Sequence, residues 1–242
     1  MLFIGIRNEI RKIFNLKIYI AFGVFFSLIP LIIEFMSIFS NNLFGIKIND
    51  AALSSHSLMM KYILPFFAII LCIKIFNSDY KKDRIICTLL RPISKGRIYM
   101  SKVIAITVFS FFIISINVFF SILINMITEG LEANYIAKGI IALILSIGPI
   151  FVIVLLGSII TQIIKSRILN FIAFYLVLII MSLIGIYFPI AYAGTINALL
   201  VFFKLFIGKI NWIMIFNSGL ILIGYIFLFT GIGGYIFSNK KY

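Results

Sequence analysis

The sequence predicts an all-α protein that crosses a membrane several times, and three observations carry that prediction. The first is composition: 63% of the 242 residues are hydrophobic, only 12% are charged, and the mean hydropathy is +1.22. A soluble domain of this length could not cover so much apolar surface with so few charges, so lipid must be the solvent for much of it. The second observation is a series of six apolar stretches, and the third is the position of the basic residues at the ends of those stretches.

Six apolar stretches are long enough to cross a bilayer as helices, which takes about 20 residues each. They occupy approximately residues 18–39, 62–78, 102–126, 139–164, 169–190 and 213–237. The second stretch is the shortest and contains Lys74, whose ammonium group lies near the inner end and can reach the interface. No linker or soluble domain interrupts the series, so residues 1–242 are predicted to form one transmembrane domain.

Lys and Arg are distributed unevenly between the two sides of the predicted membrane protein. Fifteen lie on one side and five on the other, with Lys74 inside a span. The richer side is the cytoplasmic one in membrane proteins, so both termini are predicted in the cytoplasm, as an even number of spans requires. The net charge of +14 does not indicate nucleic acid as a partner, because the basic residues stand at the ends of apolar runs.

Residues 1–16 have the pattern of an amphipathic helix. Apolar residues recur at steps of three and four, and charged residues fall between them: Arg7, Glu9, Arg11 and Lys12. A helix of this kind is suited to lie in the cytoplasmic membrane interface. The alternative is a basic flank that only sets the topology.

The residues needed for catalysis are scarce. The chain has seven acidic residues, one histidine and two cysteines, and it contains neither an HExxH helix nor a GxSxG elbow. It also has no GxxxxGK[ST] loop, so it cannot bind and hydrolyse ATP by that route. Cys72 and Cys87 are not expected to form a disulfide or a thiolate metal site. We therefore expect no catalytic residue, no metal site and no bound cofactor in this chain.

A few polar and small residues lie within the apolar stretches. Glu34 is the one acidic residue there, and Glu34 and Asn117 are candidates for a translocation path. The alternatives are a headgroup-level position for Glu34 and hydrogen bonds between helices for amides such as Asn117 and Asn170. Four glycines of the last stretch could allow close approach of another helix: Gly224, Gly231, Gly233 and Gly234.

The segment from residue 78 to residue 102 is a basic island between the second and third stretches. It holds seven Lys and Arg residues, and its apolar residues lie on one helical face: Ile85, Ile86, Leu89 and Leu90. Pro92 disfavours helical geometry at Arg91, so a short amphipathic helix should end there. Residues 94–96 are then expected to form a turn before the third span. Such a helix suits a groove on a soluble partner, although it could rest on lipid or serve only as a topology signal.

The run DYKKDRIICTLLRPISKGRIYMSKVI resembles the loop between the second and third spans of type-2 ATP-binding-cassette (ABC) exporter permeases. The family pattern has an acidic residue, a Gly-Thr pair, a leucine-rich segment, RPISR and a lysine before the third span. The matching residues are Asp79, Leu89, Leu90, Arg91, Pro92, Ile93, Ser94 and Lys102. Asp83 and Arg84 replace the usual Gly-Thr pair, and Lys95 replaces an arginine. The N-terminal segment NEIRKIF and the six spans extend the resemblance over essentially the whole chain.

The resemblance implies a permease whose loop 79–101 docks on a separate ATPase. The implied coupling residues are Lys81, Asp83, Arg84, Ile85, Ile86, Leu89, Leu90, Arg91, Pro92 and Ile93. Two ATPase subunits would bind ATP and Mg²⁺, and the permease would pair with a second copy or a paralogue in the bacterial cell membrane.

The implied cargo is a small amphiphilic molecule. Similarity to small permeases of bacteriocin-immunity and peptide-antibiotic resistance systems makes an antimicrobial peptide or a drug the first expectation, with sodium or a lipid-linked cargo as less favoured ones. The alternative function is a non-transporting immunity or sensor protein that binds a peptide.

Overall fold

The fold was analysed in a computed structural model that describes residues 2–15, 17–29, 32, 36, 59–77, 94–128, 133–187 and 212–239. Every regular element in these ranges is a helix, which confirms the all-α prediction for them. The α-helices are α1 (Leu2–Phe14), α2 (Lys17–Ser27), α5 (Leu64–Cys72), α8 (Lys95–Thr128), α9 (Ala133–Ile163), α10 (Arg167–Tyr187) and α12 (Trp212–Asn239). Two π-helical segments, η1 (Met59–Ile63) and η2 (Ile73–Asn77), flank α5.

Three helices of the described chain are long and apolar enough to cross a membrane. Their apolar parts are Lys95–Leu123, Gly139–Ile163 and Gly219–Asn239, and two shorter apolar helices are Leu64–Asn77 and Arg167–Met181. The total of six spans and the side on which the termini lie remain predictions. The second half of the predicted first span and the segment between α10 and α12 lie outside the described residues.

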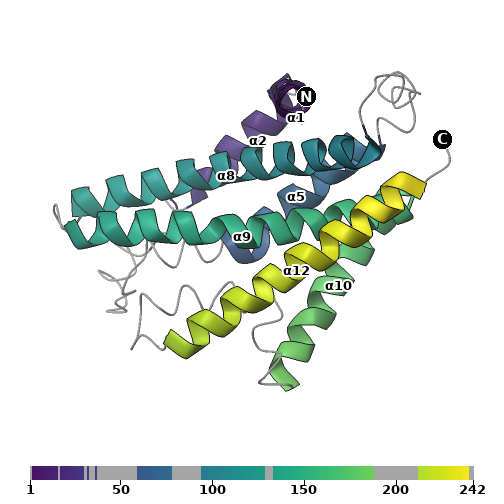
Figure 1. Cartoon of the computed structure of the whole chain (residues 1–242). Helices are drawn as coiled ribbons and strands as arrows, with labels where there is room; N and C mark the ends of the chain where they lie inside the picture. The colour runs from purple at the N-terminus through teal and green to yellow at the C-terminus, as the bar shows by residue number, and fades with distance from the viewer. Residues whose placement is uncertain are drawn as a thin grey trace.

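The long helices α8 and α9 run antiparallel and form the centre of the bundle (Figure 1). Helices α1 and α2 pack on α8, α5 packs on both α8 and α9, and α12 crosses the same pair. Helix α10 contacts α9 and α5 and diverges from the bundle toward its far end (Figure 1). As a result, the start of α8, the end of α9, the start of α10 and the end of α12 all meet at one end of the molecule.

The core lies where α5, α8 and α9 meet. Its fully buried side chains include Phe67 and Leu71 of α5, Ile106 of α8 and Val154 of α9. The opposite faces of α10 and α12 leave apolar side chains uncovered, and Ile168 and Phe227 are 73% and 74% exposed. Helices that leave such faces uncovered are suited to lipid, which is as apolar as those side chains.

Helix α5 is preceded and followed by π-helical segments, whose turns are wider than those of an α-helix. Pro65 stands in the first turn of α5, and proline lacks an N–H and its ring crowds the carbonyl four residues earlier. The π-helical segment η1 precedes it and gives that turn more room. The second wide segment, η2, ends at Asn77, directly before residues 78–93. In this region Lys74 is exposed, as expected for an ammonium group that reaches the interface.

Candidate functional site

The basic loop that the sequence singled out joins η2 to α8, and the structure describes both of its ends. Residues 78–93 lie outside the described residues, and so do all ten predicted coupling residues, from Lys81 to Ile93. Glu34, one of the two predicted path residues, also lies outside them. The candidate site is therefore the junction formed by the end of η2, the first turns of α8 and the elements that contact them.

Helix α8 begins earlier than the sequence predicted. The turn expected at residues 94–96 is wrong, because Lys95 is already the first helical residue. The carbonyl oxygen of Ser94 accepts hydrogen bonds from the N–H groups of Arg97, at 3.0 Å, and Ile98, at 3.3 Å. Serine is a favoured residue directly before a helix, so Ser94 starts α8 and does not end a turn. The loop is thus joined to the third span through continuous helix.

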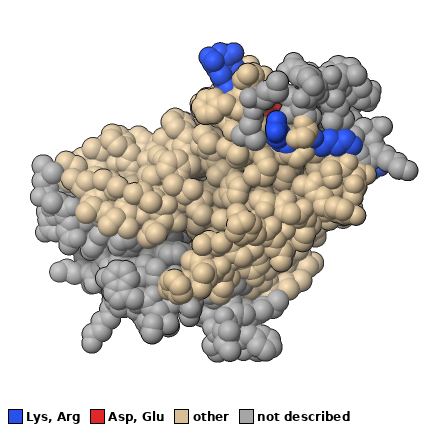
Figure 2. Space-filling view, viewed as in Figure 1, with Lys and Arg blue, Asp and Glu red and all other residues tan. Residues whose placement is uncertain are grey.

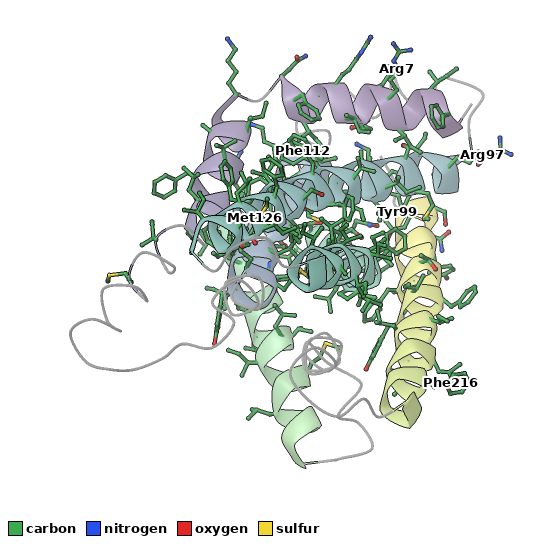
Figure 3. The ribbon with its side chains drawn as sticks, turned by 90° about the vertical axis from the view of Figure 1, so that its left-hand side faces the viewer. Arg7, Arg97, Tyr99, Phe112, Met126 and Phe216 are labelled. Atoms are coloured by element: carbon green, nitrogen blue, oxygen red, sulfur yellow. The ribbon has the colours of Figure 1, made fainter. Side chains whose placement is uncertain are left out.

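The first turns of α8 are attached to α12 and α9. The Nζ of Lys95 donates a hydrogen bond to the carbonyl oxygen of Ser238, at 2.9 Å. One turn later, the hydroxyl groups of Tyr99 and Ser158 share a hydrogen bond of 2.9 Å. Tyr99 is 1% exposed, and Figure 3 shows it beside α12. The residues joined by these two bonds lie 143 and 59 positions apart in the sequence.

Gly233 provides the space that the ring of Tyr99 occupies. A Cβ atom at position 233 would lie 2.6 Å from the Cζ of Tyr99 and even closer to its hydroxyl oxygen. A Cβ at Gly224, Gly231 or Gly234 would meet nothing within 4 Å. Of the four glycines noted in the sequence, Gly233 alone therefore permits close contact between α12 and another part of the described chain.

Three aromatic rings connect both ends of the loop to the end of α12. Phe237 lies 5.9 Å from Tyr99 and 6.4 Å from Phe76, measured between ring centroids. Phe76 lies next to the last residue of η2, and its own ring is 6.1 Å from that of Tyr99. All three side chains are almost completely buried. Pairs with such spacing stabilise by about 0.5–1.5 kcal/mol beyond the area they bury.

A cluster of charged groups fixes α1 on the same part of α8. Glu9 is 5% exposed, and its Oε1 lies 2.7 Å from the Nζ of Lys12 and 3.9 Å from the Nζ of Lys102. Lys102 is 2% exposed, and its ammonium group also lies 5.7 Å from the centroid of the Phe76 ring. Lys102, predicted only as a basic residue before a span, is thus a buried contact between α1, η2 and α8.

The amphipathic helix predicted for residues 1–16 is present as α1. Arg7, Arg11 and Lys12 are exposed, and Figure 3 shows Arg7 pointing away from α8. Glu9 differs from the prediction, because it faces α8 and not the membrane surface. Gly5 allows the close approach: a Cβ there would lie 3.2 Å from the Cβ of Ser101. That the exposed face lies in the cytoplasmic interface remains a prediction.

Exposed basic residues gather at this end of the bundle. They lie on α1, on α8 and at the start of α10 and include Arg7, Arg11, Arg97 and Arg167. In the view of Figure 2, Lys and Arg occupy the upper edge near α1 and the start of α8, and the remaining described surface has none. The helix packing therefore places basic residues that are distant in sequence side by side.

Asn117, the other predicted path residue, lies in the interior of the bundle. Its side chain is completely buried, and in the part of the chain that the structure describes neither its amide nitrogen nor its amide oxygen has a hydrogen-bond partner. The hydrogen bond to another helix that the sequence allowed is therefore wrong for Asn117. Asn170 is equally buried, but its Nδ2 donates to the carbonyl oxygen of Ile164 at 3.2 Å.

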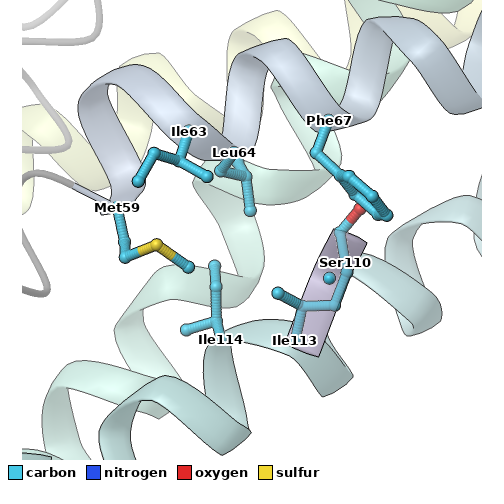
Figure 4. Close-up of a pocket in the computed structure, with 8 residues that line it drawn as sticks. Met59, Ile63, Leu64, Phe67, Ser110, Ile113 and Ile114 are labelled. Atoms are coloured by element: carbon cyan, nitrogen blue, oxygen red, sulfur yellow. The ribbon is translucent and has the colours of Figure 1, made fainter. Parts of the chain in front are cut away.

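A small apolar cavity lies about one helical turn from Asn117, between α2, η1, α5 and α8 (Figure 4). Its lining includes Gly23, Met59, Phe67 and Ile114. Ser110 also lines it, and its buried hydroxyl has no hydrogen-bond partner. The free space is about that of one water molecule, so the cavity cannot hold a larger ligand in this conformation.

The comparisons with known proteins identify the family. The family model described as ABC-2 family transporter protein matches residues 5–182, which is well over half of the chain. The chain belongs to the ABC-2 transporter family. The match includes α1, the basic loop and the first turns of α8, and it ends within α10, so that α12 lies outside it. A search of curated proteins gave no match.

Membership of the ABC-2 family confirms the predicted resemblance and the predicted class of membrane transport protein. The sequence did not reveal the contacts that hold the loop ends. Tyr99 is an aromatic residue of the basic island, Phe237 is an aromatic residue at the end of the last apolar stretch, and Ser238 contributes only a backbone oxygen. Lys95 stands seven residues before Lys102, at the first position of α8. This pair of lysines is the one signal in the sequence that could have suggested that the start of α8 is anchored at two separate points.

Proposed function

We propose that this chain is the membrane subunit of an ATP-driven exporter and that its loop 79–101 docks on a separate ATPase. The observation that carries the proposal is the match of residues 5–182 to the ABC-2 transporter family. It is supported by the absence of a GxxxxGK[ST] motif from the sequence, because ATP must then be bound by another chain. ATP and Mg²⁺ would bind to the ATPase subunits and none to this chain.

The position of the loop ends supports the same proposal. Asn77 and Lys95 lie at the end of the bundle where basic residues gather, which would be the cytoplasmic end in a bacterial cell membrane. Movement of a docked loop would act directly on η2 and α8. Two ATPase subunits and a second permease copy or paralogue would complete the transporter.

The cargo that we propose is a small amphiphilic molecule, with an antimicrobial peptide or a drug as the first candidate. Support comes from the apolar interior, in which the buried amide of Asn117 has no hydrogen-bond partner among the described residues. Such an interior offers contact to apolar groups and a few hydrogen bonds, which is what an amphiphilic molecule needs.

The direct test is co-purification. The tagged chain is expressed together with candidate ABC ATPases of the same cell, and the purified complex is tested for ATP hydrolysis in proteoliposomes. We expect a stable complex whose hydrolysis rate rises when peptide antibiotics are added. A chain that protects cells equally well when no such ATPase is present would instead be the non-transporting immunity or sensor protein, and the proposal would be wrong.

Substitutions in the loop should separate ATP hydrolysis from transport. Leu89→Asp or Arg91→Glu should lower transport at least about ten-fold, because a new carboxylate in a protein interface costs more than about 1.4 kcal/mol. Both variants should still be recovered in the membrane fraction and should leave hydrolysis by the ATPase in place. Cys87→Ser, in the same loop but off the predicted apolar face, is the matched control. Normal coupling in both charged variants would exclude the loop as the docking segment.

Replacing Asn117 should have opposite effects on stability and transport. Asn117→Leu removes two buried polar atoms that have no partner, so it should raise the free energy of unfolding by about 1–3 kcal/mol. If the amide contacts cargo, cell resistance to peptide antibiotics should fall at the same time. Asn170→Leu is the control, because it removes the hydrogen bond that the Nδ2 of Asn170 donates to the carbonyl oxygen of Ile164 and should lower the melting temperature. Equal destabilisation by both substitutions would show that Asn117 is satisfied in the membrane.

A further inference from the structure

We propose that the last helix, α12, receives the movement of the loop through Lys95 and Tyr99, and that both side chains are positioning residues for transport. This inference rests on the proposed function. The family match ends at residue 182, before α12 begins at Trp212, so it assigns no role to this helix.

Both ends of the loop contact Phe237 of α12, and the α8 side also contacts Ser238. On the η2 side, Phe76 packs against Phe237. On the α8 side, Tyr99 packs against Phe237 and Lys95 donates to the carbonyl oxygen of Ser238. A displacement of either end of the loop therefore changes contacts at the end of α12.

The contact between Tyr99 and α12 restricts movement in two directions. The ring fills the space beside Gly233, so α12 cannot slide along its axis without pressing another residue against the ring. The hydroxyl of Tyr99 is held at 2.9 Å by Ser158 of α9, so the ring cannot turn away freely. Interdigitated contacts of this kind shift between discrete arrangements and do not deform continuously. Helices α8 and α12 should therefore move together at this end.

Lys95 adds an electrostatic connection at the last turn of α12. Ser238 is the last residue but one of that helix, and the last four carbonyl groups of an α-helix have no partner within it. A cation at a helix C-terminus is favourable because of the partial negative charge there. The bond from Lys95 satisfies one of these carbonyls from the first residue of α8. The first residue of α8 is in this way bonded to the end of the last helix.

The resting connection can be tested on the chain alone by measuring distances between spin labels. One label is placed at Val108 of α8 and one at Tyr235 of α12, both exposed, in a background in which Cys72 and Cys87 are replaced. We expect a narrow distance distribution that broadens in Tyr99→Leu and, to a smaller extent, in Lys95→Met. The control pair joins Phe112 and Ile144, exposed residues of α8 and α9 away from the contact. An unchanged distribution between Val108 and Tyr235 in both variants would overturn the inference.

Transmission is tested in the complex with the ATPase. A third label position, Ile168 at the start of α10, serves as reference for both Val108 and Tyr235. In the wild-type complex, trapping with ATP and vanadate should shift both distances. In Tyr99→Leu, the shift of Val108 should persist and the shift of Tyr235 should be lost. A shift of Tyr235 that survives in Tyr99→Leu contradicts this inference alone, whereas the absence of any shift in the wild-type complex contradicts the proposed function.

Discussion

Gly233→Ala should destabilise the protein clearly, whereas Gly234→Ala should not. The new methyl group at 233 would lie 2.6 Å from the Tyr99 ring carbon and 3.3 Å from a side-chain carbon of Ile159. Overpacking of this kind costs about 1–3 kcal/mol, from which the higher helix propensity of alanine recovers up to about 1 kcal/mol. At position 234 the methyl group meets nothing within 4 Å, so only the stabilisation from the higher helix propensity of alanine remains. The melting temperatures of the two purified variants measure the difference.

The same contact predicts a rescue. Removing the ring with Tyr99→Ala makes room for the methyl group. Gly233→Ala should therefore lower the free energy of unfolding much less in that background than in the wild type. Tyr99→Ala by itself should destabilise, because it leaves a cavity and removes the hydrogen bond between Tyr99 and Ser158. Strict additivity of the two substitutions would mean that residues 99 and 233 are not in contact.

Glu9→Gln should be the most damaging single substitution in α1. It removes the negative charge that offsets the buried ammonium group of Lys102, and loss of one partner of a buried ion pair costs about 3–5 kcal/mol. Lys12→Gln removes the shorter contact of the same carboxylate, yet about half of the Lys12 side chain is exposed. Exposed pairs contribute about 0–1 kcal/mol, so this second substitution should be nearly neutral. Thermal unfolding in detergent measures both.

A double substitution distinguishes the loss of a pair from a simple loss of packing. Glu9→Leu combined with Lys102→Met replaces both buried charges with apolar groups, and such replacements are often neutral or stabilising. The double variant should therefore be more stable than Glu9→Leu alone. A double variant that is less stable than either single one would show that the charges of Glu9 and Lys102 contribute independently.

Much of this architecture was predictable from local patterns. Apolar runs of sufficient length predicted the helices of α8, α9, α10 and α12, and the alternation of apolar and basic residues predicted α1. The basic loop carried the family resemblance, which the match over residues 5–182 confirmed. These features are local because a chain in lipid must satisfy its backbone hydrogen bonds within each segment, so that composition and length decide where helices form.

The beginning of α8 was predicted wrongly for a related reason. Ser94, Lys95 and Gly96 follow a proline and have turn-forming composition, so the sequence favoured a turn. Lys95 instead bonds to Ser238, and Tyr99 packs against α12 one turn later. Contacts with a helix more than a hundred residues away stabilise α8 in this region and override the local preference.

The sequence by itself determined that the chain is helical, apolar and basic at the segment ends, and that it carries an ABC-2 type loop and no GxxxxGK[ST] motif. Only the tertiary structure decided that Gly233, and not Gly224, Gly231 or Gly234, accepts the ring of Tyr99, and that Glu9 faces Lys102. The physical reason is that these contacts depend on the rotation and relative height of packed helices. Four glycines of one helix have the same local properties, and only the position of α8 beside α12 makes one of them different.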